Sequence, residues 1–327
     1  MKYCSILLLL VILGCKSTAT SITEKNSSVE NKISRQALYY KVAQSSVSET
    51  LKTLTTDEME GRESGKKGGD KAAAYLSALL EKYNVKPYFK TYRDTLNNSQ
   101  GTAFNVVGFI EGNDPVLKNE FIVLGAHYDH IGITKEGIDG DFINNGANDD
   151  ASGVTAVAEL AKFFGANKTN KRSILIVFFA AEETGLLGSF HLAEKLKKQH
   201  FNLYSMLNFE MIGVPMKADY TAYITGFSKS NMAAKINEYS GKKLVGYLPM
   251  EFQYQLFTRS DNFPFYKEFN VPSQTVCTFD FTNFDYYHHV KDEFEVMDIP
   301  HMTSFIQDII PVVEQMTNSN AKEIVLK

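Results

Sequence analysis

Short continuous apolar runs recur along the chain, and they predict buried strands. They cover residues 104–110, 121–126, 173–180, 206–209 and 276–279, and Gly or Asn bounds several of them. Strands that are apolar on consecutive positions, rather than on alternate ones, are typical of sheets covered on both faces.

Between these runs, apolar residues recur at three- and four-residue spacing, and this pattern predicts helices. The alternation of strands and helices indicates an α/β fold with a mostly parallel, mixed central sheet and helices on both faces. Ligands of such sheets bind beyond the carboxyl ends of the strands. The predicted helices cover 67–83, 152–164, 185–198, 231–239 and 303–316, the last with a possible kink at Pro311.

The N-terminus reads as an export signal. A short positive start is followed by eight apolar residues, too few to span a bilayer, and then by Ile12-Leu13-Gly14-Cys15. This segment resembles the bacterial lipobox, in which the Cys is acylated and becomes the new N-terminus. We therefore predict a lipoprotein signal peptide at 1–14, a flexible tether at 15–31 and a single catalytic domain at 32–327. Lys16 after Cys15 favours export to the outer membrane, so Cys15 is the expected membrane contact.

Composition narrows the chemistry. The chain is 44% hydrophobic and 22% charged, as in ordinary globular proteins, and its formal net charge of −4 argues against a nucleic-acid partner. Only Cys277 of the three cysteines lies outside the leader, so neither a disulfide framework nor a thiolate zinc site is expected. Any metal must be held by His, Asp and Glu.

Polar groups of that kind follow the apolar runs. Each alone has an ordinary explanation: a strand-end histidine, a helix-capping aspartate or a solvated glutamate pair. Together they are expected at one sheet edge, where carboxylates would repel one another unless a divalent cation lay between them. They are His127-Tyr128-Asp129-His130, Asp149-Asp150, Glu182-Glu183, Glu210 and His288-His289.

These segments resemble the co-catalytic zinc aminopeptidases, a family with a zinc-peptidase, phosphorylase/hydrolase-like fold. The most specific motif is Gly146-Ala147-Asn148-Asp149-Asp150-Ala151-Ser152-Gly153. The others are His127-x-Asp129, Glu182-Glu183-x-Gly185, Asn208-Phe209-Glu210-Met211-Ile212-Gly213 and Tyr287-His288 with Asp292.

The resemblance implies two zinc ions per chain, with Asp149 bridging them. His127, Glu183, Glu210 and His288 would complete the two shells; the family more often has Asp at the position of Glu210. His288 is preferred over its neighbour His289 because it lies four residues before Asp292, as in the family. Asp129 would orient His127 from the second shell, and a cis peptide is implied between Asp149 and Asp150.

The implied reaction is the release of N-terminal amino acids from peptides by a zinc-activated water, with Glu182 as general base. One alternative is a glutaminyl-peptide cyclotransferase-like enzyme with a single zinc, although the chain has no Trp and has Asp150 after the bridging Asp149. Another is a metal-free, receptor-like binding domain. Metal content separates the three hypotheses: two ions, one or none. The oligomeric state is not predicted.

Three further features are weaker. Glu60-Gly61-Arg62 resembles a family motif with a structural role. Asp261, in Arg259-Ser260-Asp261, either supports the site or caps the helix after it. Candidates for an apolar substrate pocket, with core packing as the default explanation, are Met211, Phe252, Tyr254 and Phe257.

Overall fold

A mixed sheet forms the centre of the protein in the computed structural model, which describes Met1, residues 34–98 and residues 101–327. The predicted signal peptide and tether therefore fall, apart from Met1, outside the described residues. Residues from 34 onward belong to one compact unit. Across the described segments, every helix is too short or too polar to cross a bilayer.

The described part of the sheet has nine strands in the order β1-β3-β7-β4-β8-β11-β9-β10, with β2 paired to β3. The middle strands β7, β4, β8 and β11 run parallel, whereas β1, β2 and β3 join the sheet antiparallel. The sheet is thus mixed with a parallel centre, as predicted. Its strands are β1 Lys86–Pro87, β2 Arg93–Asn98, β3 Gly101–Ile110, β4 Phe121–His127, β7 Ser173–Phe179, β8 Leu203–Glu210, β9 Ala222–Ile224, β10 Val245–Gly246 and β11 Ser273–Cys277.

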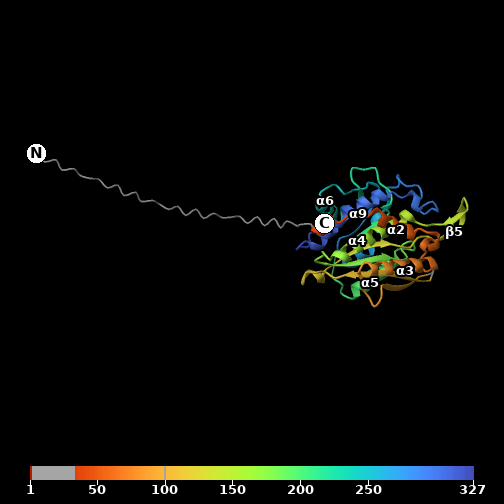
Figure 1. The fold of residues 1–327 in the computed structure, drawn as a ribbon, viewed down its shortest axis with the longest axis horizontal. Coiled ribbons are helices and arrows are strands. Elements are labelled where there is room, and N and C mark those ends of the chain that lie inside the picture. The colour runs from red at the N-terminus through yellow and green to blue at the C-terminus, as the bar shows by residue number, and fades with distance from the viewer. Residues whose placement is uncertain (2–33, 99–100) are drawn as a thin grey trace. The chain divides into compact units, whose positions relative to one another are not determined.

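Both faces of the sheet are buried, which explains the continuous apolar runs. In β7, Ile174 and Ile176 pack into one core cluster, and Leu175 and Val177 pack into another on the opposite face. Helices α3 and α4 pack on the first face, with α2 and α9 packed against α4, and α5 and α8 cover the second face. Figure 1 labels α2, α4 and α9 on one side of the sheet and α5 on the other. The helices are α1 Arg35–Tyr39, α2 Gln44–Leu54, α3 Lys67–Lys82, α4 Gly153–Asn167, α5 Leu187–Lys198, α6 Met232–Ser240, α7 Met250–Tyr254, α8 Asn262–Phe269 and α9 Ile299–Asn318, with short helical turns at Asp57–Arg62, Leu117–Asn119, Ala147–Ser152, Leu256–Thr258 and Phe294–Val296.

Each predicted strand and helix is present, with shifted ends. The helix predicted at 185–198 begins at Leu187, because Gly185 and Leu186 have φ values of 98° and 60° and form a turn instead. The strand predicted at 276–279 is β11, Ser273–Cys277, and ends before Thr278, whose side-chain hydroxyl donates to the Met211 and Val214 carbonyls. Pro311 lies inside α9.

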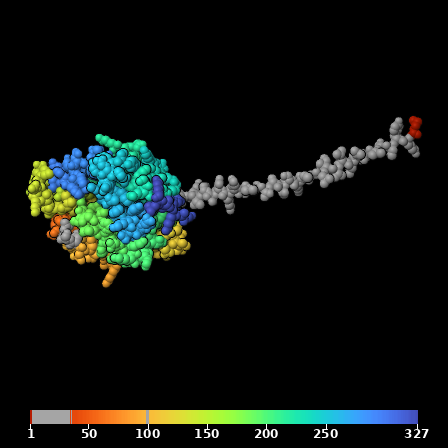
Figure 2. Space-filling view, turned by 180° about the vertical axis from the view of Figure 1, so that it is seen from behind, coloured from red at the N-terminus to blue at the C-terminus, as the bar shows by residue number. Residues whose placement is uncertain are grey.

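A separate hairpin was not predicted, because its two strands are short and largely polar. It consists of β5 Ile133–Ile138 and β6 Asp141–Ile143. Figure 2 shows this hairpin, in yellow, at one end of the molecule beside blue residues from the late part of the chain. An ion pair of 3.7 Å between Asp139 and Lys291 joins the two segments.

Candidate metal centre

Three neighbouring strands bring predicted site residues to one edge of the sheet. β7, β4 and β8 are adjacent and parallel, so their carboxyl ends meet. His127 is the last residue of β4, Glu210 is the last residue of β8, and Glu182 and Glu183 follow β7. This is the edge at which the sequence predicted the site.

Asp149 comes from the turn that precedes α4. The turn starts at Gly146, whose φ is 54° and where a Cβ would lie 2.3 Å from the Asp149 carbonyl oxygen. The peptide bond between Asp149 and Asp150 is cis, as the family resemblance implies. Asp150 Oδ1 accepts hydrogen bonds from the N–H groups of Gly153, at 3.0 Å, and Met211, at 2.9 Å. Asp150 thereby ties the start of α4 to the residue after Glu210.

His288 reaches the centre from the loop before α9. Its ring stacks on that of Tyr287, with 4.0 Å between centroids, and its Nε2 faces Asp149 and Glu183. His289 does not share this arrangement: its Nδ1 accepts a hydrogen bond of 3.0 Å from the Lys291 N–H. The structure therefore places His288, rather than its neighbour, at the carboxylates.

The side chains form two imidazole–carboxylate groups that share Asp149. On one side, His127 Nε2 lies 3.1 Å from Asp149 Oδ1 and 3.5 Å from Glu210 Oε1. On the other, His288 Nε2 lies 3.1 Å from both Asp149 Oδ2 and Glu183 Oε2. All five residues predicted as metal ligands are thus brought together, with Asp149 in the middle.

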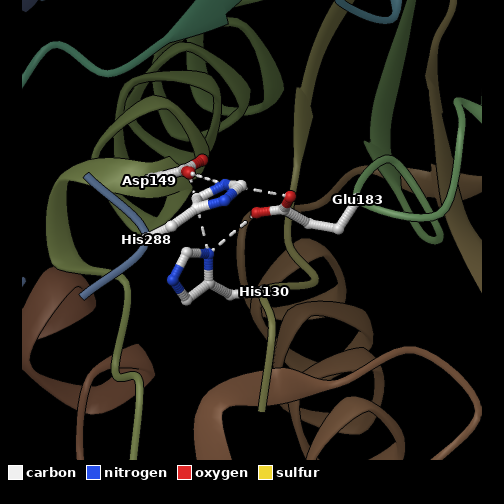
Figure 3. A group of neighbouring side chains, drawn as sticks. All are labelled: His130, Asp149, Glu183 and His288. Carbon is white, nitrogen blue, oxygen red and sulfur yellow. Dashed lines mark hydrogen bonds and ion pairs between the residues drawn. The ribbon is translucent and has the colours of Figure 1, made fainter. Parts of the chain in front are cut away.

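His130 belongs to the second group, although the sequence analysis gave it no role. Its Nδ1 lies 2.9 Å from Glu183 Oε1 and 3.7 Å from Asp149 Oδ2 (Figure 3). One ligand atom from each of His130, Asp149, Glu183 and His288 lies within 4.8 Å of the others. The signal was available, since His130 stands in the same strand-end run as His127.

Asp129, predicted to orient His127, contacts its ring through the main chain. The nearest acceptor to His127 Nδ1 is the backbone carbonyl of Asp129, at 3.0 Å, while the Asp129 carboxylate is 3.8 Å away. That carboxylate instead accepts a hydrogen bond of 3.1 Å from the Glu182 N–H. Asp129 therefore orients the imidazole through its main chain and holds the Glu182 backbone through its side chain.

Glu182 lies within the first group, close to His127 and Glu210, and one ligand atom from each of the three lies within 4.8 Å of the others. Burial raises its pKa well above the ordinary range, and the neighbouring carboxylates of Glu210 and Asp261 act in the same direction. Divalent cations beside Glu182 would oppose this shift and favour the ionised carboxylate, which is the form that can accept a proton from water.

The imidazoles and carboxylates compensate one another. Burial would lower the pKa of His288, but Asp149 and Glu183 raise it to about 10. Burial acts to raise the pKa of Asp149, yet the imidazoles of His127 and His288 hold it well below its ordinary value. Protonated imidazoles therefore balance the carboxylates, and a metal that binds here would displace those protons.

A cavity opens beside the two groups. Asp149, Glu182, Glu183 and Glu210 line it on one side, and Met211, Leu256 and Phe279 contribute an apolar wall. Of the apolar candidates from the sequence, Met211 is a lining residue. Phe252 is 87% exposed and Phe257 is 5% exposed, and neither lines this cavity.

Arg62 and Asp261, from two further motifs of the sequence, are both buried residues. The fully buried Arg62 donates to the carbonyl oxygens of Tyr128 at 2.7 Å and Gly146 at 2.8 Å. It thus joins the two segments that carry His127 and Asp149, a structural role. Asp261 is buried at the start of α8 but makes no capping hydrogen bond there.

The chain is similar in sequence to proteins named as zinc metalloproteases. One relative, from Pyrenophora teres f. teres and named "Probable zinc metalloprotease", is 38% identical over 117 residues, which cover 36% of this chain and 24% of the relative. The chain spans about a quarter of the length of the first curated relatives that it matches.

Two solved structures show the same fold. The Legionella pneumophila LapA aminopeptidase has a TM-score of 0.67 at 22% identity, covering 88% of this chain and 76% of LapA. The Porphyromonas gingivalis glutaminyl cyclase has a TM-score of 0.66 at 17% identity, covering 84% of this chain and 99% of the cyclase. The model of Peptidase family M28 matches residues 105–313, more than half of the chain and the span that holds every residue of the two groups, so the protein belongs to peptidase family M28.

Proposed function

We propose that this protein is a zinc-dependent aminopeptidase that binds two zinc ions per chain and releases N-terminal amino acids from peptides. The observation that carries the proposal is the position of Asp149 between two imidazole–carboxylate groups. Membership of the peptidase family supports the reaction class.

The donor atoms fit a pair of cations. His127 Nε2 and Asp149 Oδ2 are buried and, among the described residues, make no hydrogen bond, although each faces a group of opposite charge 3.1 Å away. Buried polar atoms without hydrogen bonds are costly unless another partner binds them. Imidazole nitrogens and carboxylate oxygens suit zinc. Cys277 also lines the cavity, but burial raises the pKa of its thiol, which disfavours the thiolate that would bind a metal.

Each residue has a defined task in this proposal. His127, Asp149 and Glu210 would hold one ion, and Asp149, Glu183 and His288 the other. When bound, zinc supplies a Lewis acid and lowers the pKa of a water at the site. The Glu182 carboxylate accepts a proton from the attacking water and returns it to the leaving amine nitrogen. The Asp129 carboxylate keeps Glu182 in place through the Glu182 N–H.

The cavity supports exopeptidase action on apolar residues. Its apolar wall of Met211, Leu256 and Phe279 lies directly beside the carboxylates, so the side chain of the substrate's N-terminal residue can be buried next to the peptide bond that is cut. We therefore expect substrates with an apolar N-terminal residue and a free amino group.

A glutaminyl cyclase is the second candidate, favoured by the likeness in fold to the Porphyromonas enzyme. The two candidates differ in metal content and product. A receptor-like role without metal is disfavoured because every predicted ligand position carries a competent side chain that faces the centre.

The deciding experiment combines zinc titration with product analysis. Purified protein from residue 16 onward, freed of metal and titrated with zinc, should bind two ions and cleave leucyl-4-nitroanilide but not its N-acetylated form. A single bound ion, together with cyclisation of glutaminyl peptides, would support the second candidate. No bound zinc would exclude both.

We also propose that the chain is exported and lipid-anchored through Cys15 in the bacterial outer membrane. The support is the run Ile12-Leu13-Gly14-Cys15 after a short apolar core, followed by Lys16. Metabolic labelling with an alkyne fatty acid should mark the wild type in the membrane fraction and should not mark Cys15→Ser. Equal labelling of both would refute the anchor.

A further inference from the structure

Arg259 lies where two openings on the protein meet. It lines the cavity that contains Asp149 and Glu210, and it also lines an adjoining groove bounded by Phe190 and Phe263. Glu182, Glu183 and Tyr287 are likewise common to both. A peptide that occupies the cavity and extends into the groove must therefore pass Arg259.

The guanidinium of Arg259 is available to a ligand. The side chain is exposed, and it makes no ion pair or hydrogen bond within the described parts of the chain. Four carboxylates line the same cavity, yet none of them pairs with it. Of the described residues that line the cavity or the groove, Arg259 is the one lysine or arginine.

The backbone of Arg259 is fixed relative to the centre. Its N–H donates to the Leu256 carbonyl at 3.1 Å, and the residues that follow it, Ser260 and Asp261, are buried. The Ser260 hydroxyl accepts a hydrogen bond of 2.9 Å from the Asn208 side chain, and Asn208 lies two residues before Glu210 in β8. The anchored backbone keeps Arg259 at the edge of both openings.

Charge balance indicates which ligand this is. The four cavity carboxylates are those of Asp149, Glu182, Glu183 and Glu210. Two divalent ions would neutralise the four negative charges, and the positive charge of Arg259 would then have no counter-charge among the lining residues. An arginine binds a carboxylate through two parallel hydrogen bonds, a geometry that lysine cannot supply.

We propose that Arg259 binds a carboxylate of the peptide substrate next to the bond that is cut. The inference rests on the proposed peptidase function and narrows its substrates. The carboxylate comes either from the C-terminus of a dipeptide or from an acidic side chain flanking the bond, and both present the same chemistry to the guanidinium.

The test uses matched substrates that differ in one carboxylate. These are Leu-Ala against Leu-Ala-amide, Leu-Glu-amide against Leu-Gln-amide, and Glu-Ala-amide against Gln-Ala-amide. For the zinc-loaded enzyme, Arg259→Gln should lower kcat/KM about ten- to a hundredfold for the carboxylate member of the responding pair, the loss expected for a charged hydrogen bond. The neutral member should change little, and the pair that responds identifies the source.

Two further variants test whether the loss is specific to the guanidinium of Arg259. Arg259→Lys keeps the charge and should recover part of the loss. Lys267→Gln removes a positive charge from α8, where Lys267 lies over the Phe190 ring but lines neither opening. It should leave the ratio of kcat/KM between the two members of each substrate pair unchanged. Zinc content and unfolding temperature of Arg259→Gln should equal those of the wild type.

The outcomes separate this inference from the function on which it rests. One outcome is that the wild type cleaves the peptides while Arg259→Gln lowers kcat/KM equally for both members of every pair, or for neither. In that case the proposed carboxylate site is wrong, and the proposed peptidase function is still supported. If zinc-loaded wild type cleaves none of the six substrates, both proposals fall.

Discussion

The carboxylate of Asp292 accepts a hydrogen bond of 3.0 Å from the backbone N–H of Asp149. Its other oxygen accepts one of 2.7 Å from the N–H of Asn148. Asp292 lies four residues after His288, so a single short segment supplies an imidazole to the centre and fixes the backbone of the carboxylate that both groups share.

Asp292→Ala should therefore weaken both the fold and the metal site. The substitution leaves two buried N–H groups without acceptors, at a cost of roughly 1–3 kcal/mol each. We expect a lower free energy of unfolding in urea and a higher zinc dissociation constant in chelator competition. Asp298→Ala is the control, because it removes one hydrogen bond to His301 N–H at the start of α9 and should cost about 1 kcal/mol without changing zinc affinity. Unchanged zinc affinity in Asp292→Ala would contradict this role.

Glu182→Gln should retain zinc and lose most turnover. Glutamine preserves the size of the side chain but cannot accept the proton, and removal of a general base costs on the order of 10²–10⁴-fold in rate. Hydrolysis of aminoacyl anilides and zinc content by mass spectrometry measure the two effects. The neighbouring Glu183→Gln should lose zinc as well as activity. A fully active Glu182→Gln enzyme would rule out this base.

Asp149→Ala should abolish binding of both ions. Among the described residues, Asp149 is the one whose side chain has an oxygen 3.1 Å from each of the two imidazoles, His127 and His288. A variant that loses a ligand used by a single ion, such as Glu210→Ala, should still bind the other. Zinc titration of the two variants makes the comparison, and a stoichiometry in Asp149→Ala equal to that of the wild type would remove it from the shared position.

The sequence allowed the fold and the position of the site to be predicted because burial on both faces leaves a strong pattern. β4 and β7 are apolar on consecutive positions, and the polar residues that follow them stand out for that reason. The short strands β9 and β10 carry too few residues for such a pattern, and β2, with Arg93 and Asp94, reads as polar. Their place in the sheet depends on pairing with distant residues.

The finer contacts of the site depend on main-chain geometry that side-chain identity does not encode. Asp129 was expected to orient His127, and its carbonyl oxygen, rather than its carboxylate, lies closer to the ring. From the sequence, His130 was assigned no role of its own. Only the path of the chain after β4 brings its ring to Glu183.

His130→Asn tests what this additional imidazole does. If Nδ1 binds metal, asparagine should raise the zinc dissociation constant as much as alanine does, because an amide is a poor zinc ligand. If Nδ1–H only donates to Glu183, asparagine should keep that donor and preserve affinity. We expect the second result, since Nδ1 lies at hydrogen-bond distance, 2.9 Å, from Glu183 Oε1 and the proposed ligands of this ion are Asp149, Glu183 and His288. His289→Asn, which changes a histidine outside both groups, should leave zinc binding unaltered.

In the metal-free protein, the contribution of Asp261 to stability should decrease as the pH rises above about 4. Burial raises the pKa of Asp261 from 3.8 to about 7. The folded protein therefore holds this proton more tightly than the unfolded chain does, so the stabilisation is complete below about pH 4 and is lost as the pH rises through about 7.

Asp261→Asn cannot ionise and should flatten this part of the profile, with a difference of a few kcal/mol at most between the two proteins. Urea unfolding of metal-free wild type and variant at pH 5 and pH 8 measures it. Asp114→Asn is a control with the opposite pH dependence. Backbone hydrogen bonds from Leu117 and Val116 lower the pKa of Asp114, so this variant should differ from the wild type in how stability changes at acid pH and not between pH 5 and pH 8. Wild type and Asp261→Asn with the same loss between the two pH values would show that Asp261 stays charged in the folded protein.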